Sequence, residues 1–433
     1  MTNLSMKPVP GLLLASHEIP TAPPALKAIL QPDQYWPARI LSDDIVQVHA
    51  RGKKVVHVMQ PDLATGILAD DSGMFAKHGL YRKIAGGESG PQSMIALEGK
   101  QAWAAKTTFG ALLAQRQSFK HVPMIQDVTR RLSRELAEGG AGETNISALL
   151  SAITFEIIWR VMFDPESTEA PLPDFVRSNI AEIFQARMAA DHLRVTALIS
   201  DTAVRSLELT KNCPHMRSEF IARGNETLSP DVLLDNIRLM LSAGHKTSAS
   251  AVAWTLWLLS REPEATGKAR SEIATTDLSD PKSFVRLDYT MAALREAMRL
   301  LPPAVMTVRQ ARQHTTLGAL DVARGTPVIV NFYAMHRHQK LWSDPDIFRP
   351  SRFLVPQSEE IITGAYRPFS AGAHVCLGTK FAELESVVIL SEMLTRFEFS
   401  PGKDAPKPIY SFTLHAWDGV PLTARARKRA ETT

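Results

Sequence analysis

The sequence predicts a mainly α-helical protein with a small β lobe. From about residue 60 to residue 300, apolar residues recur at helical spacing, and Gly- or Pro-bearing breaks separate the segments. Short β-branched runs lie before and after this region. Because the sequence has no internal repeat, we expect an irregular, Pro-rich segment over residues 1–40 and one domain over residues 41–433.

The composition is ordinary for a globular protein. Of 433 residues, 45% are hydrophobic and 22% are charged, and 49 basic against 45 acidic residues leave a net charge of +4. This hydrophobic fraction excludes wholesale disorder, and a chain of this length can bury a core large enough to enclose a cofactor. A charge of +4 over this length does not favour a nucleic-acid partner.

The cysteines and the apolar runs indicate the compartment. Cys213 and Cys376 are too few and too far apart for a disulfide framework or a zinc cluster, so we expect a reducing, cytoplasmic location. No apolar run approaches the roughly 18–20 residues that cross a bilayer, and the run at residues 12–14 is too short for a signal peptide. We therefore expect no membrane span.

Several elements follow from local patterns in the first half of the chain. Two β-branched runs, Ile45–His49 and Lys54–Val58, flank turn residues and predict a β-hairpin. Amphipathic helices are expected over three segments, namely Asp127–Leu136, Asn145–Met162 and Asp174–Ala189.

The clearest helix begins at Ser229. The Ser229 side chain can cap free amides, Pro230 presets the first turn, and Asp231 complements the positive helix end. The apolar period continues to about Arg261, and a helix of about thirty residues is about 45 Å long, enough to cross a whole domain.

The last third of the chain mixes helices and strands. A helix over Tyr289–Leu301 is expected to end at Pro302, and a strand is expected over Thr326–Val330. Prolines break the segment Leu341–Phe353, and a last long helix is expected to start near Leu377.

The most informative segment is the loop at residues 369–378, FSAGAHVCLG, which places Cys376 before that last helix. A thiolate there meets unpaired amides and the positive end of the helix dipole, and both stabilise the anion. The small residues let the backbone approach a flat ring closely, and His374 could meet a propionate of that ring. Outside such a pattern, a lone cysteine is usually a small buried hydrophobe.

This loop resembles the haem-binding loop of cytochrome P450 enzymes, which has the form Phe-x-x-Gly-x-x-x-Cys-x-Gly. Phe369, Gly372, Cys376 and Gly378 occupy all four specified positions. The resemblance implies the P450 fold, a haem b cofactor, and Cys376 as the thiolate ligand of the iron.

Two further motifs agree with this resemblance. Glu296 and Arg299 lie at i,i+3 spacing in an expected helix. Alone, such a pair would be a common solvent-exposed ion pair that contributes little to stability. With the later string FRPSRF at residues 348–353, they match the family's Glu-x-x-Arg and Phe-x-Pro-x-Arg-Phe motifs. The resemblance implies a buried structural triad of Glu296, Arg299 and Arg352 that supports the thiolate loop, and a haem propionate bound by Arg309.

The middle of the long expected helix carries Gly244, although glycine in a helix costs about 1 kcal/mol relative to alanine. Either it packs closely against another helix, or it forms a groove for dioxygen beside the ring. The string AGHKTS at residues 243–248 resembles the family's oxygen-activation motif, Ala-Gly-x-(Asp/Glu)-Thr. Ala243, Gly244 and Thr247 are therefore catalytic candidates, with the Thr247 hydroxyl serving the bound oxygen.

Lys246 departs from that motif, because the family has an acid before the threonine. An ammonium has donors only, so it cannot accept and relay a proton as a carboxylate does. One hypothesis is that Lys246 turns outward to an acid on a neighbouring helix, which leaves Thr247 and ordered water as the relay. The alternative is that oxygen scission is impaired and the enzyme uses peroxide or catalyses a non-hydroxylating oxidation.

A less exact match covers residues 98–106, EGKQAWAAK. It resembles the family helix that places an aromatic residue or His, and an Arg, on the haem propionates. Alignment on Gly99 puts Lys106 at the Arg position, whereas Trp103 lies one residue beyond the aromatic position. Ordinary surface and core roles are the alternatives for Lys106 and Trp103.

Together the motifs imply a soluble, bacterial-type haem-thiolate monooxygenase that inserts one atom of O2 into a small, mainly apolar substrate. The expected pocket residues are mostly apolar and comprise Leu239, Ala304, Val305, Met306, Thr307, Phe412 and Leu414. An alternative of another class is a haem-thiolate sensor, which would need no oxygen groove.

The electrons are expected from separate proteins. The sequence contains no Gly-x-Gly-x-x-Gly fingerprint after a strand and no cysteine cluster for an iron–sulfur centre. We therefore expect no fused reductase, but a ferredoxin-type donor with an NAD(P)H-dependent reductase. Lys106 and Lys380 are candidates for the positive charge that such a donor would meet.

Overall fold

The computed structural model describes residues 8–10, 36–50, 53–70, 72–134, 136, 142–163, 172–185, 192–212, 224, 226–411, 413–416 and 418–427. The chain divides into two units, each built from separate stretches of sequence. The first unit comprises Met1–Tyr81, Arg295–Cys376 and Lys407–Ala416. The second unit comprises Arg82–Leu294, Leu377–Pro406 and Trp417–Thr433. The expectation of one domain over residues 41–433 stays a prediction.

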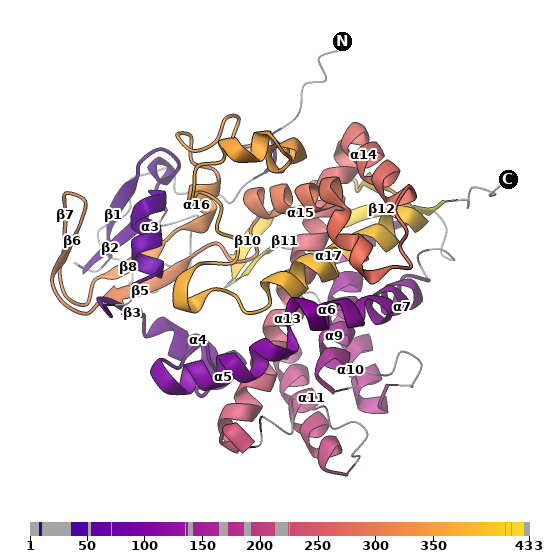
Figure 1. Ribbon diagram of the computed structural model, residues 1–433, viewed down its shortest axis with the longest axis horizontal. Helices are drawn as coiled ribbons and strands as arrows, with labels where there is room; N and C mark the ends of the chain where they lie inside the picture. The colour runs from indigo at the N-terminus through magenta and orange to yellow at the C-terminus, as the bar shows by residue number, and fades with distance from the viewer. Residues whose placement is uncertain are drawn as a thin grey trace. The chain divides into compact units, whose positions relative to one another are not determined.

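The first unit is built around a five-stranded sheet in the order β1-β2-β8-β5-β3 (Figure 1). Its strands are β1 (Ile45–Ala50), β2 (Lys53–Val58), β3 (Phe75–Lys77), β5 (Thr307–Ala311) and β8 (Pro327–Val330). The predicted hairpin is present, because β1 pairs with β2 in antiparallel register, with Ile45 opposite Val58. Every residue of β8 is buried, since β8 lies between β2, to which it runs parallel, and β5, to which it runs antiparallel.

Shorter elements complete the first unit. The helices and 3-10 helices are η1 (Ala38–Leu41), α3 (Pro61–Leu68), α16 (Phe332–His336), η5 (Pro350–Phe353), η6 (Gln357–Glu360) and η7 (Gly372–His374). The remaining strands form two hairpins, β6 (Thr315–Leu317) with β7 (Leu320–Val322), and β10 (Pro408–Ser411) with β11 (Thr413–Ala416). Two helices continue from one unit into the other along the chain, α4 (Leu80–Glu88) and α15 (Asp288–Leu300).

The second unit is mainly helical. Its α-helices are α5 (Gly99–Leu112), α6 (Gln115–Ser118), α7 (Val122–Leu132), α9 (Ile146–Phe163), α10 (Asp174–Gln185), α11 (His192–Asn212), α13 (Pro230–Arg261), α14 (Pro263–Ala274) and α17 (Thr379–Arg396). It also contains η2 (Phe119–His121), η4 (Pro281–Arg286) and a sheet in the order β4 (Gly142–Asn145), β12 (Pro421–Ala426), β9 (Phe397–Pro401). The predicted fold class, mainly α with small β-sheets, is confirmed.

The long helix α13 organises the second unit. It spans 32 residues, and the Ser229 hydroxyl caps it by accepting a hydrogen bond from the Val232 amide at 3.5 Å. The helix packs against α9, α11 and α17. A Cβ atom on Gly244 would lie 2.9 Å from Cγ1 of Ile158 on α9, so only glycine permits this approach without a shift of the neighbouring side chain. The close-packing interpretation of Gly244 is therefore confirmed.

Helix ends differ from the predictions where a capping signal was overlooked. Helix α7 begins at Val122 instead of Asp127, because Pro123 occupies its first turn, where proline is well tolerated. Helix α17 begins at Thr379, so Cys376 precedes it by a short turn. Residues 186–189 of the expected third helix lie outside the described residues, as does Phe412.

One helix corrects the expectation about apolar runs. Helix α9 is long and apolar enough to cross a membrane by composition, with a mean hydropathy of 1.6 over its 18 residues. However, 89% of this window is buried inside the protein, as is usual for a core helix. Its Glu156 is also buried, and it forms an ion pair with Arg160 at 2.8 Å and another with Arg131.

Helix α17 carries a buried acid that the sequence patterns did not reveal. Glu385 is 1% exposed, and neither of its carboxylate oxygens has a well-formed hydrogen bond within the described part of the chain. Burial raises the pKa of Glu385 to about 8, which the nearby Ser248 hydroxyl on α13 only partly offsets. Glu385 is therefore neutral below this pH, and its ionisation opposes folding.

We predict that Glu385→Gln stabilises the protein in a pH-dependent way. The pKa in the folded protein exceeds the ordinary value of 4.5, so the wild type loses stability as the pH rises from about 4.5 through 8. The variant should unfold in urea with a free energy a few kcal/mol above wild type at pH 8, and with little difference at pH 5.

Glu398→Gln, at an exposed position of β9, is the matched control and should show no such gain. An equal change of Glu385→Gln stability at both pH values would contradict the assignment of a raised pKa.

Candidate functional site

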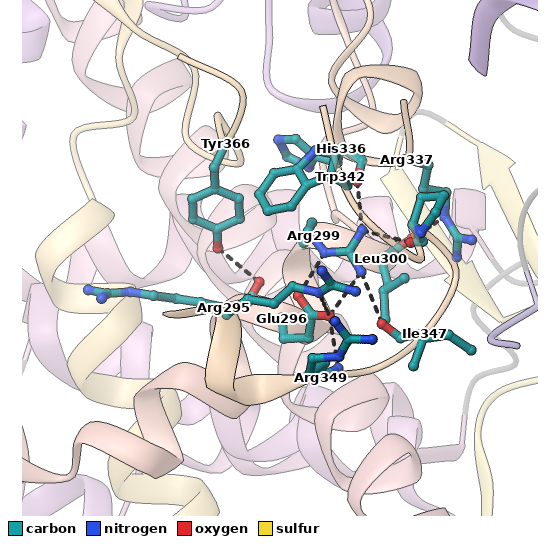
Figure 2. A network of polar contacts seen from close by, with 12 residues as sticks. Arg295, Glu296, Arg299, Leu300, His336, Arg337, Trp342, Ile347, Arg349 and Tyr366 are labelled. Atoms are coloured by element: carbon teal, nitrogen blue, oxygen red, sulfur yellow. Dashed lines mark hydrogen bonds and ion pairs between the residues drawn. The ribbon is translucent and has the colours of Figure 1, made fainter. Parts of the chain in front are cut away.

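A buried ion pair marks the C-terminal turns of α15. Glu296 and Arg299 are both 0% exposed. Arg299 Nε donates to Glu296 Oε2 at 2.7 Å, and Arg299 Nη2 donates to Oε1 at 2.9 Å, so the guanidinium binds the carboxylate in bidentate fashion (Figure 2). The i,i+3 spacing places the two groups on one helix face, and two parallel hydrogen bonds make this geometry strong and specific.

The same two side chains bind a distant segment of the chain. Arg299 Nη1 donates to the carbonyls of His336 and Pro345, at 2.8 and 2.7 Å. Glu296 Oε1 accepts from the Arg349 amide at 2.9 Å and from Arg352 Nε at 3.1 Å. Glu296 therefore contacts both arginines of the predicted triad, and the three residues fix the segment from 336 to 352 against α15. Figure 2 shows this segment wrapping around the pair.

His336 extends the network toward the cysteine loop. Burial, reinforced by the charge of Arg299, lowers the pKa of His336 to about 3, so the ring is neutral at physiological pH. Its Nε2 accepts a hydrogen bond from the Arg367 amide at 2.8 Å. Next to it, the Tyr366 hydroxyl donates to the Arg295 carbonyl of α15 at 3.1 Å (Figure 2). Tyr366 and Arg367, which precede the loop closely, are thus held by the same network.

The cysteine loop has a fixed backbone and an exposed thiol. The Cys376 amide donates to the Phe369 carbonyl at 3.0 Å, and Cys376 itself is exposed. Gly372 has φ +66°, and a Cβ there would lie 2.1 Å from the Leu68 carbonyl oxygen. Only glycine can occupy this position, since the conformation and the space both exclude a side chain. Ala373 and His374 are exposed on the same turn.

Arg309 lies on β5 and presents an unpaired cationic group. It is 2% exposed, and its Nη1 donates to the Thr307 hydroxyl at 2.8 Å. Its Nη2 is buried and makes no hydrogen bond to any described residue. Burial of a charged group without an ion-pair partner is unfavourable in free energy, so we expect an anion to bind next to this nitrogen.

The first unit therefore fits a haem on its own chemistry. Cys376 offers a soft sulfur ligand for iron, and Arg309 offers a cation for a propionate. Gly372 lets the cysteine loop pack against the Leu68 carbonyl.

The oxygen-activation string lies at the middle of α13 in the second unit. The Thr247 hydroxyl donates to the Ala243 carbonyl at 2.7 Å, which leaves its oxygen able to accept from another donor. Ala243 is exposed, and Thr247 and Lys246 are half-buried. His245 turns inward, where its Nδ1 lies 2.6 Å from the Leu241 carbonyl.

The other predicted site residues have mixed environments. On α5, Trp103 is 66% exposed and Lys106 is half-buried. The expected pocket residues divide by burial, with Val305 and Leu414 fully buried, Thr307 buried, and Leu239, Ala304 and Met306 half-buried.

Three residues of this network and of its surroundings were missed from sequence. His336, Arg367 and Tyr81 belong to no motif that was considered, and their partners lie far away along the chain.

Comparison with known proteins identifies the family. The family model described as "Cytochrome P450" matches residues 38–199 and 200–419. The protein LUTEIN DEFICIENT 5, chloroplastic, from Arabidopsis thaliana is 24% identical over 87% of this chain and 71% of its own length. Cyclooctatin synthase from Streptomyces melanosporofaciens is 32% identical over 45% of this chain and 44% of its own length.

The human steroid 17-alpha-hydroxylase/17,20 lyase is 34% identical over 42% of this chain and 38% of its own length. The crystal structure of the cytochrome P450DA heme domain superposes with a TM-score of 0.72 at 20% identity, covering 89% of both chains. The fold is therefore the P450 fold. With relatives in a plant, a bacterium and an animal, and a family model that spans most of its length, the chain belongs to the cytochrome P450 family.

Proposed function

We propose that this protein is a haem-thiolate monooxygenase that inserts one atom of O2 into a small, mainly apolar substrate. The observation that carries the proposal is the exposed thiol of Cys376 on a loop held by Gly372 and by the buried network around Glu296. When bound, a thiolate-ligated haem supplies oxygen activation, and the protein sets its position and access. The human relative's name includes a steroid hydroxylase, and steroids are apolar, which supports this substrate class.

Each residue has a defined task in this proposal. Cys376 provides the axial sulfur, and the Glu296, Arg299 and Arg352 triad supports its loop without touching the substrate. Arg309 and His374 bind haem propionates, with Lys106 and Trp103 as further candidates. The Thr247 hydroxyl holds or passes a proton, because it both donates to the Ala243 carbonyl and can accept from a further donor.

The electron source belongs to the same proposal. We infer a separate ferredoxin-type donor with an NAD(P)H-dependent reductase, in a soluble, bacterial-type and cytoplasmic enzyme. Residues 1–433 carry no dinucleotide fingerprint and no cysteine cluster, so the electron-supplying centres of this proposal do not lie within these residues. Lys380 is exposed, and its Nζ lies 3.6 Å from Oε2 of Glu383. Lys380 is a candidate for binding an acidic surface of the electron donor.

Replacement of Cys376 tests the proposed function directly. Cys376→Ser should abolish the long-wavelength Soret band of the reduced carbon monoxide complex, because that band reports thiolate ligation. Cys213→Ser, the change of the other cysteine, is the matched control and should keep the band. A wild-type protein that stays colourless after haem-replete expression, or lacks the thiolate band, would overturn the proposal.

A second test concerns proton delivery beside Lys246. Lys246→Glu introduces a carboxylate that can accept and relay a proton, so the fraction of reducing equivalents recovered as product should change at least about twofold. Lys246→Met, which removes the charge without adding an acceptor, is the control and should stay near wild type. If the fraction of reducing equivalents recovered as product is unchanged in Lys246→Glu, the hypothesis of a proton relay through Thr247 and water is contradicted.

The alternative oxidation also has a distinct signature. If peroxide-driven turnover of the wild type exceeds ferredoxin-driven turnover, the peroxide-using interpretation of Lys246 replaces the monooxygenase proposal.

A further inference from the structure

The oxygen-activation string lies where α13 is weak as a helix on its own. Gly244 has no side chain, and glycine disfavours a helix relative to alanine. The Thr247 hydroxyl donates to the Ala243 carbonyl at 2.7 Å, and such a bond to the helix's own backbone slightly destabilises the helix. His245 Nδ1 likewise lies 2.6 Å from the Leu241 carbonyl. This turn of α13 therefore needs support from a neighbouring helix to hold one conformation.

One face of α9, which packs along α13 in the second unit, supplies that support (Figure 1). Thr154 and Ile158 are one helical turn apart on α9 and are both 0–1% exposed. Thr154 Oγ1 lies 2.9 Å from the His245 carbonyl, and Ile158 fills the space beside Gly244. The Phe155 ring meets the His245 ring edge to face, with 5.4 Å between the centroids. The three α9 side chains thus contact two consecutive residues of the string.

Thr154 differs from its two apolar neighbours because its contact is directional. Its hydroxyl has one proton and two carbonyls within reach, Leu150 of its own helix at 2.8 Å and His245 of α13 at 2.9 Å. The Leu150 carbonyl also accepts the regular helical hydrogen bond, so it stays satisfied when the proton goes to His245. Thr154 is 0% exposed, so bulk water does not replace the bond to α13. The hydroxyl can therefore tie the two helices together at a defined point.

We propose that Thr154 is a positioning residue for the oxygen-activation string, an inference that rests on the proposed function. Its hydroxyl holds the His245 carbonyl at one place along α9, while Phe155 and Ile158 set how closely α13 approaches. Because residue 245 is held, the same turn of α13 presents the Thr247 hydroxyl at one position. Thr154 acts in this proposal through α13 and not on the substrate.

The test removes the hydroxyl at almost constant volume. Thr154→Val is the test variant, and Thr154→Ala, which also lacks the hydroxyl, replaces it if Thr154→Val does not fold. Thr154→Ser keeps the hydroxyl and should restore wild-type behaviour. Thr255→Val is the matched control, because Thr255 is also 0% exposed and its hydroxyl donates to the Ala251 carbonyl of its own helix, α13, at 2.7 Å.

The first arm measures hydrogen exchange of the purified protein and needs no substrate. In Thr154→Val, peptides covering residues 241–249 should exchange roughly five- to tenfold faster than in wild type, because this turn loses one buried hydrogen bond. Peptides from α17 should keep their protection, and Thr255→Val should leave residues 241–249 near wild type. Equal acceleration of α13 and α17, or no acceleration in either, would overturn the proposal, since the hydroxyl would then support the fold in general or nothing at all.

The second arm measures how the reducing equivalents are used, with dodecanol as the apolar probe. If Thr247 is no longer held in place, proton delivery becomes less reliable, and the share of reducing equivalents released as hydrogen peroxide should rise at least about twofold in Thr154→Val. Thr154→Ser and Thr255→Val should match wild type. An unchanged share in Thr154→Val would contradict the positioning role and leave the haem-thiolate proposal intact. A wild type without the thiolate band would instead refute the proposed function, so the two failures are distinguishable.

Discussion

The carboxylate of Glu296 is the constraint on which the first unit depends. It lies fully buried between two guanidiniums, Arg299 and Arg352, and it also accepts the Arg349 amide. Burial of such charges is unfavourable unless every partner is present, so the pair on α15 and the segment that carries Arg352 must assemble together. Burial lowers the pKa of Arg352, and the charge of Glu296 opposes this. The cluster thus specifies one arrangement of these segments.

This arrangement determines where the cysteine loop lies. Arg299 holds the His336 carbonyl, and the neutral His336 ring holds the Arg367 amide, which lies just before the loop. The loop then closes through the Cys376 amide and through Gly372, whose φ of +66° and contact with Leu68 exclude any side chain. Hydrogen bonds therefore connect the buried charge of Glu296 to the loop that carries the exposed thiol of Cys376. The position of this proposed haem ligand depends on that buried charge.

Local patterns predicted the parts of the fold that local chemistry determines. The cap at Ser229, the β-hairpin and the Glu-x-x-Arg pair each depend on residues a few positions apart, and each is present. The close packing of Gly244 could not be predicted without its tertiary neighbour, Ile158, and the role of Gly244 in a dioxygen groove stays a prediction. Thr307 was expected to line an apolar pocket, because nothing nearby in the sequence indicates that Tyr81 meets its hydroxyl. The buried acid Glu385 escaped notice for the same reason, since burial is a property of the packed helices.

Hydrogen exchange of the Glu296→Gln variant tests the central claim most directly. Loss of the charge should weaken the hydrogen bond from the Arg349 amide and the hold on Arg352, so peptides covering residues 343–353 and 366–376 should both exchange at least roughly tenfold faster than in wild type. Peptides from α9, in the second unit, should keep their protection. If faster exchange were confined to α15 itself and the cysteine loop stayed as protected as before, the buried carboxylate would not be what positions Cys376.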